Sequence, residues 1–400
     1  VILVLLISVL AIDRFVFDPA REEGFRAAGH EDSQGRYPMD GAADSLAVLP
    51  FVSMSTDPEH EFFADGMTEE LLNILARVPK LRVTARTSSF FFKGKDMPVT
   101  QIADTLNVRH ILEGSVRRSG GKIRITAQLI DARSDRHLWS ETYDREVEDI
   151  FAVQDEVAGA IVESLKGSLE GLELNPVSRA HSLAAYEAYR TGRLRWWRRG
   201  SAELHEAIRL FEQAIESDPG FAPAYAALAD TWMLLVMYGD MHIMTGSELA
   251  EPMIDKALEL DPECAEAYAA RGLSRLIVGR NEEAEIALRQ AIALDADYIP
   301  AYVWISSVLA NLGRTPEQGA VLQKAIAMDP LNEVLTVNYA GNLQSRGDNE
   351  GAIQSIESMI RLQSDHAGLL SAYSEVKLKS GDLVGAWEIA RQAYQYAPEN

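Results

Sequence analysis

The segment 190–200, RTGRLRWWRRG, gathers residue types that can bind an anion. Arg guanidinium groups pair with phosphates and carboxylates, and Trp rings stack on flat ligands such as bases. The same side chains can instead lie over a helix end and pair with the many acids of the chain, and we favour this second interpretation. An anionic partner, if there is one, is expected at a patch formed by Arg193, Arg195, Trp196, Trp197, Arg198 and Arg199.

Two further stretches have some features of ligand-binding loops. Residues 114–122, GSVRRSGGK, have the first glycine of a phosphate-binding loop misplaced, and Lys122 is followed by Ile123 instead of Ser or Thr. This stretch joins two expected strands, so we predict a hairpin turn. Residues 57–65, DPEHEFFAD, lack the ligand order of a calcium loop. We favour a solvated turn with Asp65 as a helix cap, and a cation site is the alternative.

The chain carries no motif of a known catalytic type. It contains no nucleophile elbow, no zinc-protease helix and no dinucleotide fingerprint. Cys264 is the single cysteine, which excludes an intrachain disulfide and a cysteine-based zinc site. We therefore predict a region that is not an enzyme, with no catalytic residue, no cofactor and no metal.

The charge of the chain limits its partners. Its 400 residues include 60 acids and 38 bases, which give a formal net charge of -22. A nucleic-acid binder needs a positive surface for the phosphates, so we exclude nucleic acid as a partner of this region. Apolar residues make up 47% of the chain, enough for sizeable cores, and the length predicts two or three domains.

The first 17 residues, VILVLLISVLAIDRFVF, are almost entirely apolar. They fall short of the roughly 20 residues that span a bilayer, lack the basic start of a signal peptide and exceed an ordinary strand. We interpret 1–17 as a truncated transmembrane helix, with a signal peptide or a core strand as the alternatives. The flank after it holds more acids than bases, which favours an outward-facing chain. Residues 18–43 are polar and are predicted to be a linker.

Residues 44–170 alternate between short apolar strands and amphipathic helices. In 122–131, the alternate residues Ile123, Ile125, Ala127 and Leu129 point to one face of a strand. The predicted order is β-α-β-α-β-β-β-α, with three hairpin-linked strands in a mixed sheet backed by helices. The expected strands span 45–51, 81–86, 108–118, 122–131 and 137–143. A first helix is expected after Gly66, with Glu69 near its positive end. Two more helices are expected at 100–106, with Thr100 as the cap, and at 148–165.

Residues 183–400, after a linker at 171–182, are helical and periodic. Apolar helices end at recurring turns, Asp218-Pro219, Asp261-Pro262, Asp295-Ala296, Asp329-Pro330 and Ala397-Pro398, with a spacing near 34 residues. Such a period is typical of a helical solenoid.

The solenoid resembles tetratricopeptide (TPR) repeats. In the unit 265–298, Tyr268, Gly272, Ala284, Leu288 and Ala291 occupy the aromatic, small and apolar positions of that family. About six units fit, so the resemblance implies a TPR superhelix. The unit 222–262 has about nine extra residues, 238–246, which we expect to form a loop.

The TPR resemblance implies a protein or peptide partner in a concave groove lined by the first helix of each unit. The candidate groove residues are Asn311, Gln344, Ser345, Glu375 and Lys379, for which a solvated surface is an equally good interpretation.

The α/β segment is similar to another known domain. The stretches SLAVLPFVSMSTDPEHEFFADGMTEELLNIL, LRVTARTSSFFFKG, HILEGSVRRSGGKIRITAQLID and HLWSETYDREVEDIFAVQDEVAGAI resemble the TolB-like amino-terminal domain that precedes TPR repeats in bacterial membrane signalling proteins. In relatives of this architecture a class III adenylate cyclase domain or a winged-helix domain often precedes the membrane helix. TolB itself continues into a β-propeller, so its partners are not implied.

The resemblances together predict a non-catalytic sensor or scaffold region of a membrane-anchored bacterial signalling protein. It would cross the inner membrane once and hold residues 18–400 in the periplasm, with a cytoplasmic location as the alternative. The functional alternatives are the regulatory half of an adenylate cyclase or of a winged-helix transcription regulator with the output domain upstream, and an exported assembly scaffold.

Overall fold

The computed structural model describes residues 45–55, 58–76, 78, 81–119, 121–147, 150–166, 182–364 and 366–396. The predicted membrane segment 1–17, the linker 18–43 and all but the last residue of the linker 171–182 lie outside these ranges. Among the described helices, none combines the length and the apolar character needed to cross a bilayer.

The first part of the chain forms a mixed sheet, as its strand pattern predicted. The strand order is β3-β1-β4-β5-β6, with β2 beside β4. Strands β1, β2 and β3 pair parallel to their neighbours, and β4, β5 and β6 form two antiparallel hairpins. The strands are β1 (Ser45–Val48), β2 (Val52–Ser53), β3 (Arg82–Val83), β4 (His110–Ser119), β5 (Lys122–Asp131) and β6 (Arg136–Glu146).

Each face of the sheet has its own cover. Helices α2 (Pro58–Ala76) and α5 (Ile150–Lys166) pack on the face that holds Leu46, Val48 and the alternate residues 123, 125, 127 and 129 of β5. The predicted alternation of β5 is thereby confirmed. The opposite face, with Ala47 and Ile111, packs against α4 (Val99–Leu106) and against residues of the solenoid. The solenoid thus supplies part of the core of the α/β unit.

Three details of the α/β unit differ from the prediction. Helix α2 begins at Pro58, whose fixed φ suits the first turn of a helix, so Asp65 lies inside the helix and caps nothing. Thr100 lies inside α4, whose N-cap is Pro98. A short helix, α3 (Arg86–Phe90), follows β3 where the sequence had suggested only the end of a strand.

The second part of the chain is a solenoid of six helix pairs in the described residues, the number predicted. Close approach within a pair depends on small residues: a Cβ on Gly192 would lie 2.6 Å from the Phe211 ring, and one on Gly272 would lie 2.4 Å from Leu288. The pairs are α6/α7 (Leu183–Arg198, Ser201–Ser217), α8/α9 (Ala222–Met237, Ile243–Leu260), α10/α11 (Ala265–Ile277, Asn281–Leu294), α12/α13 (Ile299–Asn311, Thr315–Met328), α14/α15 (Glu333–Ser345, Asn349–Ile360) and α16/α17 (Ala367–Lys379, Leu383–Tyr396).

The extra residues of the second unit do not form the expected long loop. Only residues 238–242 separate α8 from α9, and α9 runs for 18 residues with Gly246 in its first turn. Position 246 has room only for glycine, because a Cβ there would lie 2.2 Å from the Val236 side chain. The insertion therefore lengthens a helix, since a helix satisfies its own backbone hydrogen bonds and a long loop does not.

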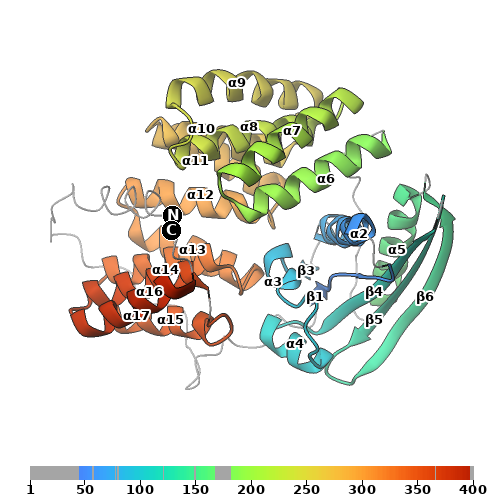
Figure 1. Cartoon of the computed structure of the whole chain (residues 1–400), viewed down its shortest axis with the longest axis horizontal. Coiled ribbons are helices and arrows are strands. Elements are labelled where there is room, and N and C mark those ends of the chain that lie inside the picture. The colour runs from blue at the N-terminus through green and yellow to red at the C-terminus, as the bar shows by residue number, and fades with distance from the viewer. Residues whose placement is uncertain are drawn as a thin grey trace.

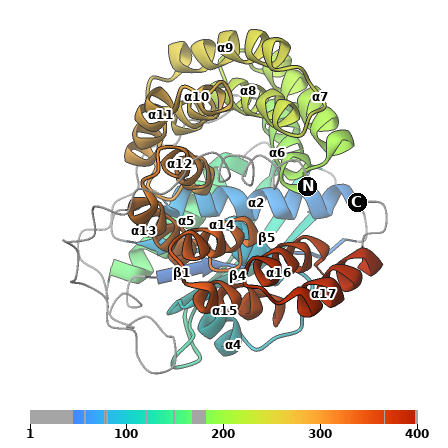
Figure 2. The same cartoon turned by 90° about the vertical axis from the view of Figure 1, so that its left-hand side faces the viewer.

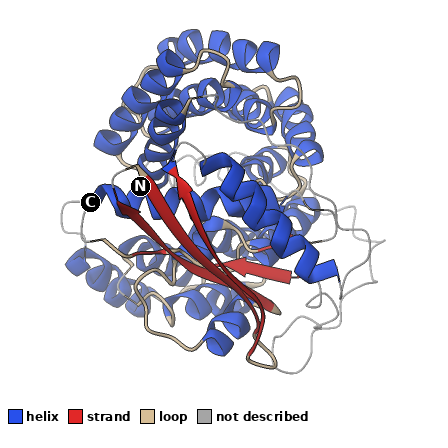
Figure 3. Ribbon diagram, turned by 90° about the vertical axis from the view of Figure 1, so that its right-hand side faces the viewer, coloured by secondary structure: helices blue, strands red, loops and turns tan. Residues whose placement is uncertain are grey.

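The solenoid curves around the α/β unit. In Figure 1 helix α2 lies between the sheet and α6, at one end of the solenoid, while α13 and the later helices lie beside the sheet. Figure 2 shows α6 to α13 as an arc whose open side is crossed by α2, and Figure 3 shows the same arc from the opposite side. The concave side of the first four repeats therefore faces the α/β unit.

Candidate functional site: a cavity between the solenoid and the α/β unit

A cavity of about 1290 Å³ lies where the arc faces the α/β unit. Its lining comes from α2 and the segment 81–87 on one side, and from α6 and the turns that begin repeats two to five on the other. The charged residues among them are Glu69, Glu70, Arg82, Arg86, Arg190, Arg193, Asp261, Glu263, Glu266, Asp295, Asp297, Lys324 and Asp329. The groove that the sequence predicted as an open partner surface is thus partly covered by the chain itself.

One contact that closes the cavity joins Ser88 of α3 to the turn after α13. Asp329 accepts hydrogen bonds through Oδ1 from the Ser88 backbone N–H at 2.9 Å and from the Ser88 hydroxyl at 2.5 Å. The Leu331 N–H donates to Ser88 Oγ at 2.8 Å. Ser88 is fully buried and Asp329 is 1% exposed, so the two units share a dry polar contact. Burial raises the pKa of the Asp329 carboxyl, and its hydrogen bonds oppose that rise.

The corresponding turns of the first three repeats have a different hydrogen bond. Asp218, Asp261 and Asp295 each accept a hydrogen bond from the N–H two residues later, at 3.1, 3.0 and 3.0 Å. After Asp329 that N–H belongs to Leu331 and donates to Ser88 instead. The Ser88 hydroxyl is therefore inserted into a turn that the first three repeats close by themselves.

A second contact joins α2 to the first repeat. The Glu69 carboxylate is 5% exposed and forms ion pairs with Arg190 of α6 and with Arg86 at the start of α3. Burial alone would raise the pKa of Glu69, but the two guanidinium groups lower it below its ordinary value. Beside them, the Tyr186 hydroxyl donates to the Gly66 carbonyl at 3.2 Å and accepts from Gln154 at 3.0 Å. The sequence had placed Glu69 near the positive end of a helix that starts after Gly66, and this was wrong, because α2 already begins at Pro58.

Backbone and apolar contacts extend the junction with the fourth and fifth repeats. The Ala85 N–H donates to the Met328 carbonyl at 3.0 Å, and the Arg82 guanidinium donates to the Ala327 carbonyl at 3.1 Å. Leu331, Met359 and Leu369 of the solenoid share one apolar cluster with α4 and the adjoining face of the sheet. The two units consequently behave as one packed body around the cavity.

The predicted groove residues lie outside the cavity lining. Asn311, Ser345 and Lys379 occupy the last turn or end of α12, α14 and α16 and are exposed. Gln344 donates to the Val376 carbonyl at 3.1 Å, which ties α14 to α16, and Glu375 is half-buried. Partner binding by these five residues stays a prediction.

The six residues of the suggested anionic patch do not form one exposed surface. Trp196 is fully buried and Arg193 is 9% exposed, whereas Arg198 is exposed. Arg195 and Arg198 pair with Glu203 at 3.0 and 4.0 Å, and the Arg199 guanidinium lies 3.8 Å from the Trp196 ring centroid. Arg193 and Trp197 line the cavity. Binding of an anionic partner by these six residues stays a prediction.

The other stretches considered from the sequence have ordinary partners. Residues 114–122 cover the hairpin between β4 and β5, with Ser119 opposite Lys122, as predicted. In the acidic stretch, Glu61 and Asp65 pair with Lys93 at 2.8 and 2.7 Å, and Asp57 lies outside the described residues. Within the described ranges, no three His, Cys, Asp or Glu side chains come together as metal ligands.

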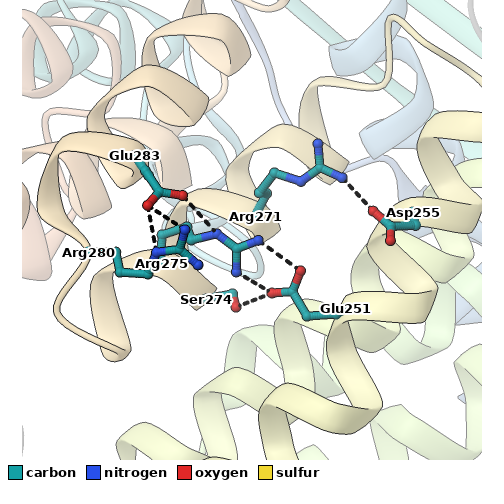
Figure 4. Close-up of polar contacts among 7 residues, drawn as sticks. All are labelled: Glu251, Asp255, Arg271, Ser274, Arg275, Arg280 and Glu283. Atoms are coloured by element: carbon teal, nitrogen blue, oxygen red, sulfur yellow. Dashed lines mark hydrogen bonds and ion pairs between the residues drawn. The ribbon is translucent and has the colours of Figure 1, made fainter.

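A third polar cluster has a purely structural arrangement (Figure 4). Glu251 of α9 accepts from both Nη atoms of Arg275 at 2.7 and 3.0 Å and from Ser274 at 2.6 Å, while Arg271 pairs with Asp255 at 2.7 Å. Arg280 and Arg275 both reach Glu283. Because Glu251 and Asp255 of α9 both pair with arginines of α10, the cluster fixes α9 against the third repeat.

Comparisons with known proteins fit the two-part fold. Residues 42–160 match the family model "HilA/YgeH-like transcriptional regulator, second domain", and residues 265–298 match a tetratricopeptide repeat model. The TolB-like identity expected for the α/β unit is not among these matches. The chain is a TPR-like helical solenoid that follows a mixed sheet.

One curated relative is much closer in sequence. "Putative adenylate cyclase 3" of Rhizobium meliloti (strain 1021) is 45% identical over 190 residues, which cover 47% of this chain and 32% of the relative. The alignment thus spans about a third of that protein's length.

Several solved structures are similar to part of this chain. YrrB, described as a TPR protein with an unusual peptide-binding site, is 20% identical with a TM-score of 0.33, covering 48% of this chain and 93% of that one. PilW, a type IV pilus biogenesis factor, is 17% identical with a TM-score of 0.43, covering 55% and 96%.

Proposed function

We propose that this chain is a non-catalytic partner-binding and regulatory region of a longer bacterial signalling protein. The observation that carries the proposal is the closed junction: the concave side of a TPR-like solenoid is joined to the α/β unit by two buried polar contacts around a cavity. A partner that enters the cavity changes the contacts of both units at once. Such a ligand shifts the equilibrium between the closed and the open arrangement of the two units, by an amount set by the difference in its affinity for the two arrangements.

We propose an adenylate cyclase as the output of that protein. Support comes from the 45% identity to a relative that is named a putative adenylate cyclase. The matched segment makes up 32% of that relative. On this proposal the α/β unit is TolB-like, the class III catalytic domain lies upstream, and the region described here regulates it.

The test measures cyclic AMP formation from ATP by the purified full-length gene product. The proposal predicts activity in the wild type and a changed rate when Ser88→Ala weakens the junction, with Ser306→Ala as the control. Ser306 is also fully buried and bonds only within its own helix. Absence of cyclic AMP formation would remove the cyclase output, and equal rates in both variants would remove the regulatory role.

A second candidate output is transcription regulation. The match of residues 42–160 to the second domain of a HilA/YgeH-like transcriptional regulator favours it. The two outputs are separated by one comparison on the same full-length protein: specific binding to DNA from its own promoter region, or cyclic AMP formation. An exported assembly scaffold would show neither activity.

We further propose that the protein crosses the inner membrane once, through 1–17, with residues 18–400 in the periplasm. Alkaline phosphatase fused after Asn400 is expected to be active in cells, since this enzyme needs an oxidising compartment. A green fluorescent fusion that glows in the cytoplasm while the phosphatase fusion stays inactive would place the region on the cytoplasmic side.

A further inference from the structure

Helix α17, the last helix of the solenoid, carries an apolar face that is exposed to solvent. Leu383, Val384, Trp387 and Tyr394 have exposed fractions between 63% and 71%. Their spacing of three and four residues places them on one side of the helix, together with Arg391. Figure 2 shows α17 at the end of the solenoid, beside α16. We call this side of the helix the α17 face.

The opposite side of α17 is packed against the rest of the solenoid. Ala386 and Ala393 are buried, and Ile389 packs against the apolar cluster of α14, α15 and α16. The Ser374 hydroxyl of α16 donates a hydrogen bond to the Ala386 carbonyl at 2.8 Å. The helix is therefore held in a fixed orientation, and the exposure of the α17 face follows from the fold of the last repeat.

In three earlier repeats a following helix covers the corresponding position. Tyr394 comes directly after Ala393, and the equivalent residues of α11, α13 and α15 are Ile292, Ile326 and Ile360. These isoleucines pack in apolar clusters that include residues of the next helix along the chain, α12, α14 and α16. A terminal repeat of a soluble solenoid ordinarily presents a polar outer face. The α17 face instead has the character of a surface that another helix covers.

The charge of the α17 face indicates which kind of helix fits it. The chain as a whole has a formal net charge of -22, whereas the charged residues of α17 are one acid, Glu388, and one base, Arg391. Neither forms an ion pair with another residue of the described ranges, and the Arg391 guanidinium lies 5.2 Å from the Trp387 ring centroid. A basic partner would be attracted to the acidic surfaces elsewhere on the chain. This neutral face favours a partner that is apolar and carries one charge of each sign.

A second copy of the same helix meets these requirements. We consider two antiparallel α17 helices related by a twofold axis midway between Glu388 and Arg391. Because both residues are equally far from the axis, Glu388 of each copy lies opposite Arg391 of the other. The same arrangement brings Trp387 near the Arg391 guanidinium of the second copy, and packs Leu383 against the turn that holds its Tyr394. Two ion pairs and the apolar contacts thus form together, and no like charges meet.

The area of the α17 face is large enough for a specific dimer. An aromatic side chain buries roughly 150–250 Å², so Trp387 and Tyr394, each 63% exposed, offer about 250 Å² per copy. Leu383, Val384 and the exposed Arg391 bring the total for two copies to about the 1,000 Å² that a specific interface needs. An interface of this size is typical of a weak, reversible association.

We propose that the chain forms a symmetric dimer through its α17 faces, with the two helices antiparallel. Glu388 and Arg391 fix the register, and Trp387 near the centre supplies much of the binding energy, as central aromatic residues do in other interfaces. The dimer leaves the cavity accessible, because α17 contributes no residue to its lining. This inference goes beyond the proposed function and does not depend on which output domain the protein carries.

Sedimentation equilibrium of the 400-residue chain tests the proposal. The detergent is matched in density to the solvent, because residues 1–17 are almost entirely apolar and bind detergent that would add to the measured mass. With increasing micromolar concentration of the chain, we expect the protein mass to rise from 44.2 kDa towards twice that value.

An exchange of charges tests whether the partner is a second copy. Arg391→Glu sets carboxylates opposite one another across the twofold axis and should raise the dissociation constant about 10-fold or more. Glu388→Arg should have the same effect through opposed guanidinium groups. The double variant Glu388→Arg/Arg391→Glu restores opposite charges across the axis and should return the dissociation constant close to the wild-type value. A partner of a different sequence would not show this rescue.

The apolar contribution is tested at Trp387. Trp387→Ser should weaken the dimer about 30-fold or more, the effect of losing a central aromatic residue. It should leave the fold intact, because the Trp387 side chain is 63% exposed. Ile286→Ser is the matched control, since Ile286 of α11 is 71% exposed and lies outside the α17 face. This control should leave the dissociation constant unchanged, and equal melting temperatures verify that each variant is folded.

Three results would overturn the proposal. A mass of 44.2 kDa at every concentration would show that no second copy binds the α17 face. A dimer that Trp387→Ser and Arg391→Glu leave unchanged would place the contact elsewhere on the chain. A double exchange that stays as weak as its single variants would exclude the antiparallel register. None of these results bears on cyclic AMP formation or DNA binding by the full-length protein, so this inference and the proposed output fail separately.

Discussion

Replacing Ser88 with Ala should loosen the junction between the α/β unit and the fourth repeat. The Ser88 hydroxyl forms two buried hydrogen bonds across this junction, one to the Asp329 carboxylate at 2.5 Å and one from the Leu331 N–H at 2.8 Å. The substitution removes both, while the Ser88 backbone N–H still donates to Asp329 at 2.9 Å. The junction is therefore weakened without being abolished.

The size of the effect follows from these two bonds. A hydrogen bond to a charged group contributes about 1.5–3 kcal/mol, and one between neutral groups about 0.5–1.5 kcal/mol. Part of the loss is recovered, because Asp329 can accept from Leu331 as Asp218, Asp261 and Asp295 accept in their own turns. We expect the closed arrangement to lose about 1.5–3 kcal/mol, which increases the open population about 10- to 100-fold.

Hydrogen exchange measured by mass spectrometry can read this change directly. Exchange of buried amides reports the free energy of local opening, segment by segment. The peptides that cover 84–92 and 328–336 should exchange about 10- to 100-fold faster in Ser88→Ala, while the far side of the solenoid, α9 to α11, should be unchanged.

Ser306→Ala is the matched control, since it removes a hydroxyl of equal size from a fully buried position away from the junction. If Ser88→Ala and Ser306→Ala leave the exchange of 84–92 and 328–336 equally slow, the inserted hydroxyl does not hold the two units together and the reasoning is refuted.

Three further outcomes are expected. Glu69→Gln leaves the buried Arg190 without its carboxylate and should destabilise the chain by about 3–5 kcal/mol in urea unfolding at pH 7. Because the pKa of Glu69 is lowered, this stabilisation is present above the ordinary carboxyl pKa, so the gap between variant and wild type should shrink as the pH falls below 4.5. Gly272→Ala should destabilise by about 1–3 kcal/mol, because its Cβ would lie 2.4 Å from a leucine, whereas Gly341→Ala meets nothing within 4 Å and should be neutral or slightly stabilising; equal melting temperatures would contradict the packing argument. Burial and the nearby Asp295 raise the pKa of Asp297 to about 6, so the wild type should lose stability as the pH rises from about 4 through about 6. Asp297→Asn should abolish this loss, which is worth up to about 3 kcal/mol. Parallel pH–stability curves for the variant and the wild type would exclude this role of Asp297.

The sequence by itself determined most of the secondary structure and the class of fold. Its period near 34 residues requires paired helices, because the small residue at Gly272 and the apolar residue at Leu288 recur at positions that only close helix packing satisfies. The alternation at 122–131 requires a strand with one buried face, since successive side chains of a strand point in opposite directions. Both are local patterns, which can be read directly from the order of residues along the chain.

Only the tertiary structure decided where the candidate site lies. Asp329 carries the same turn signature as the other repeats, and nothing near it along the chain marks it as the partner of Ser88, 241 residues away. From the sequence, Glu69 was assigned only to the positive end of a helix, because its partner Arg190 belongs to a different unit of the fold. Arg193 and Arg195 read alike in one basic segment, and the fold alone turned one into the cavity and the other toward Glu203. Such contacts depend on how the solenoid curves back onto the sheet, which is set by packing summed over six helix pairs and cannot be read from any one segment.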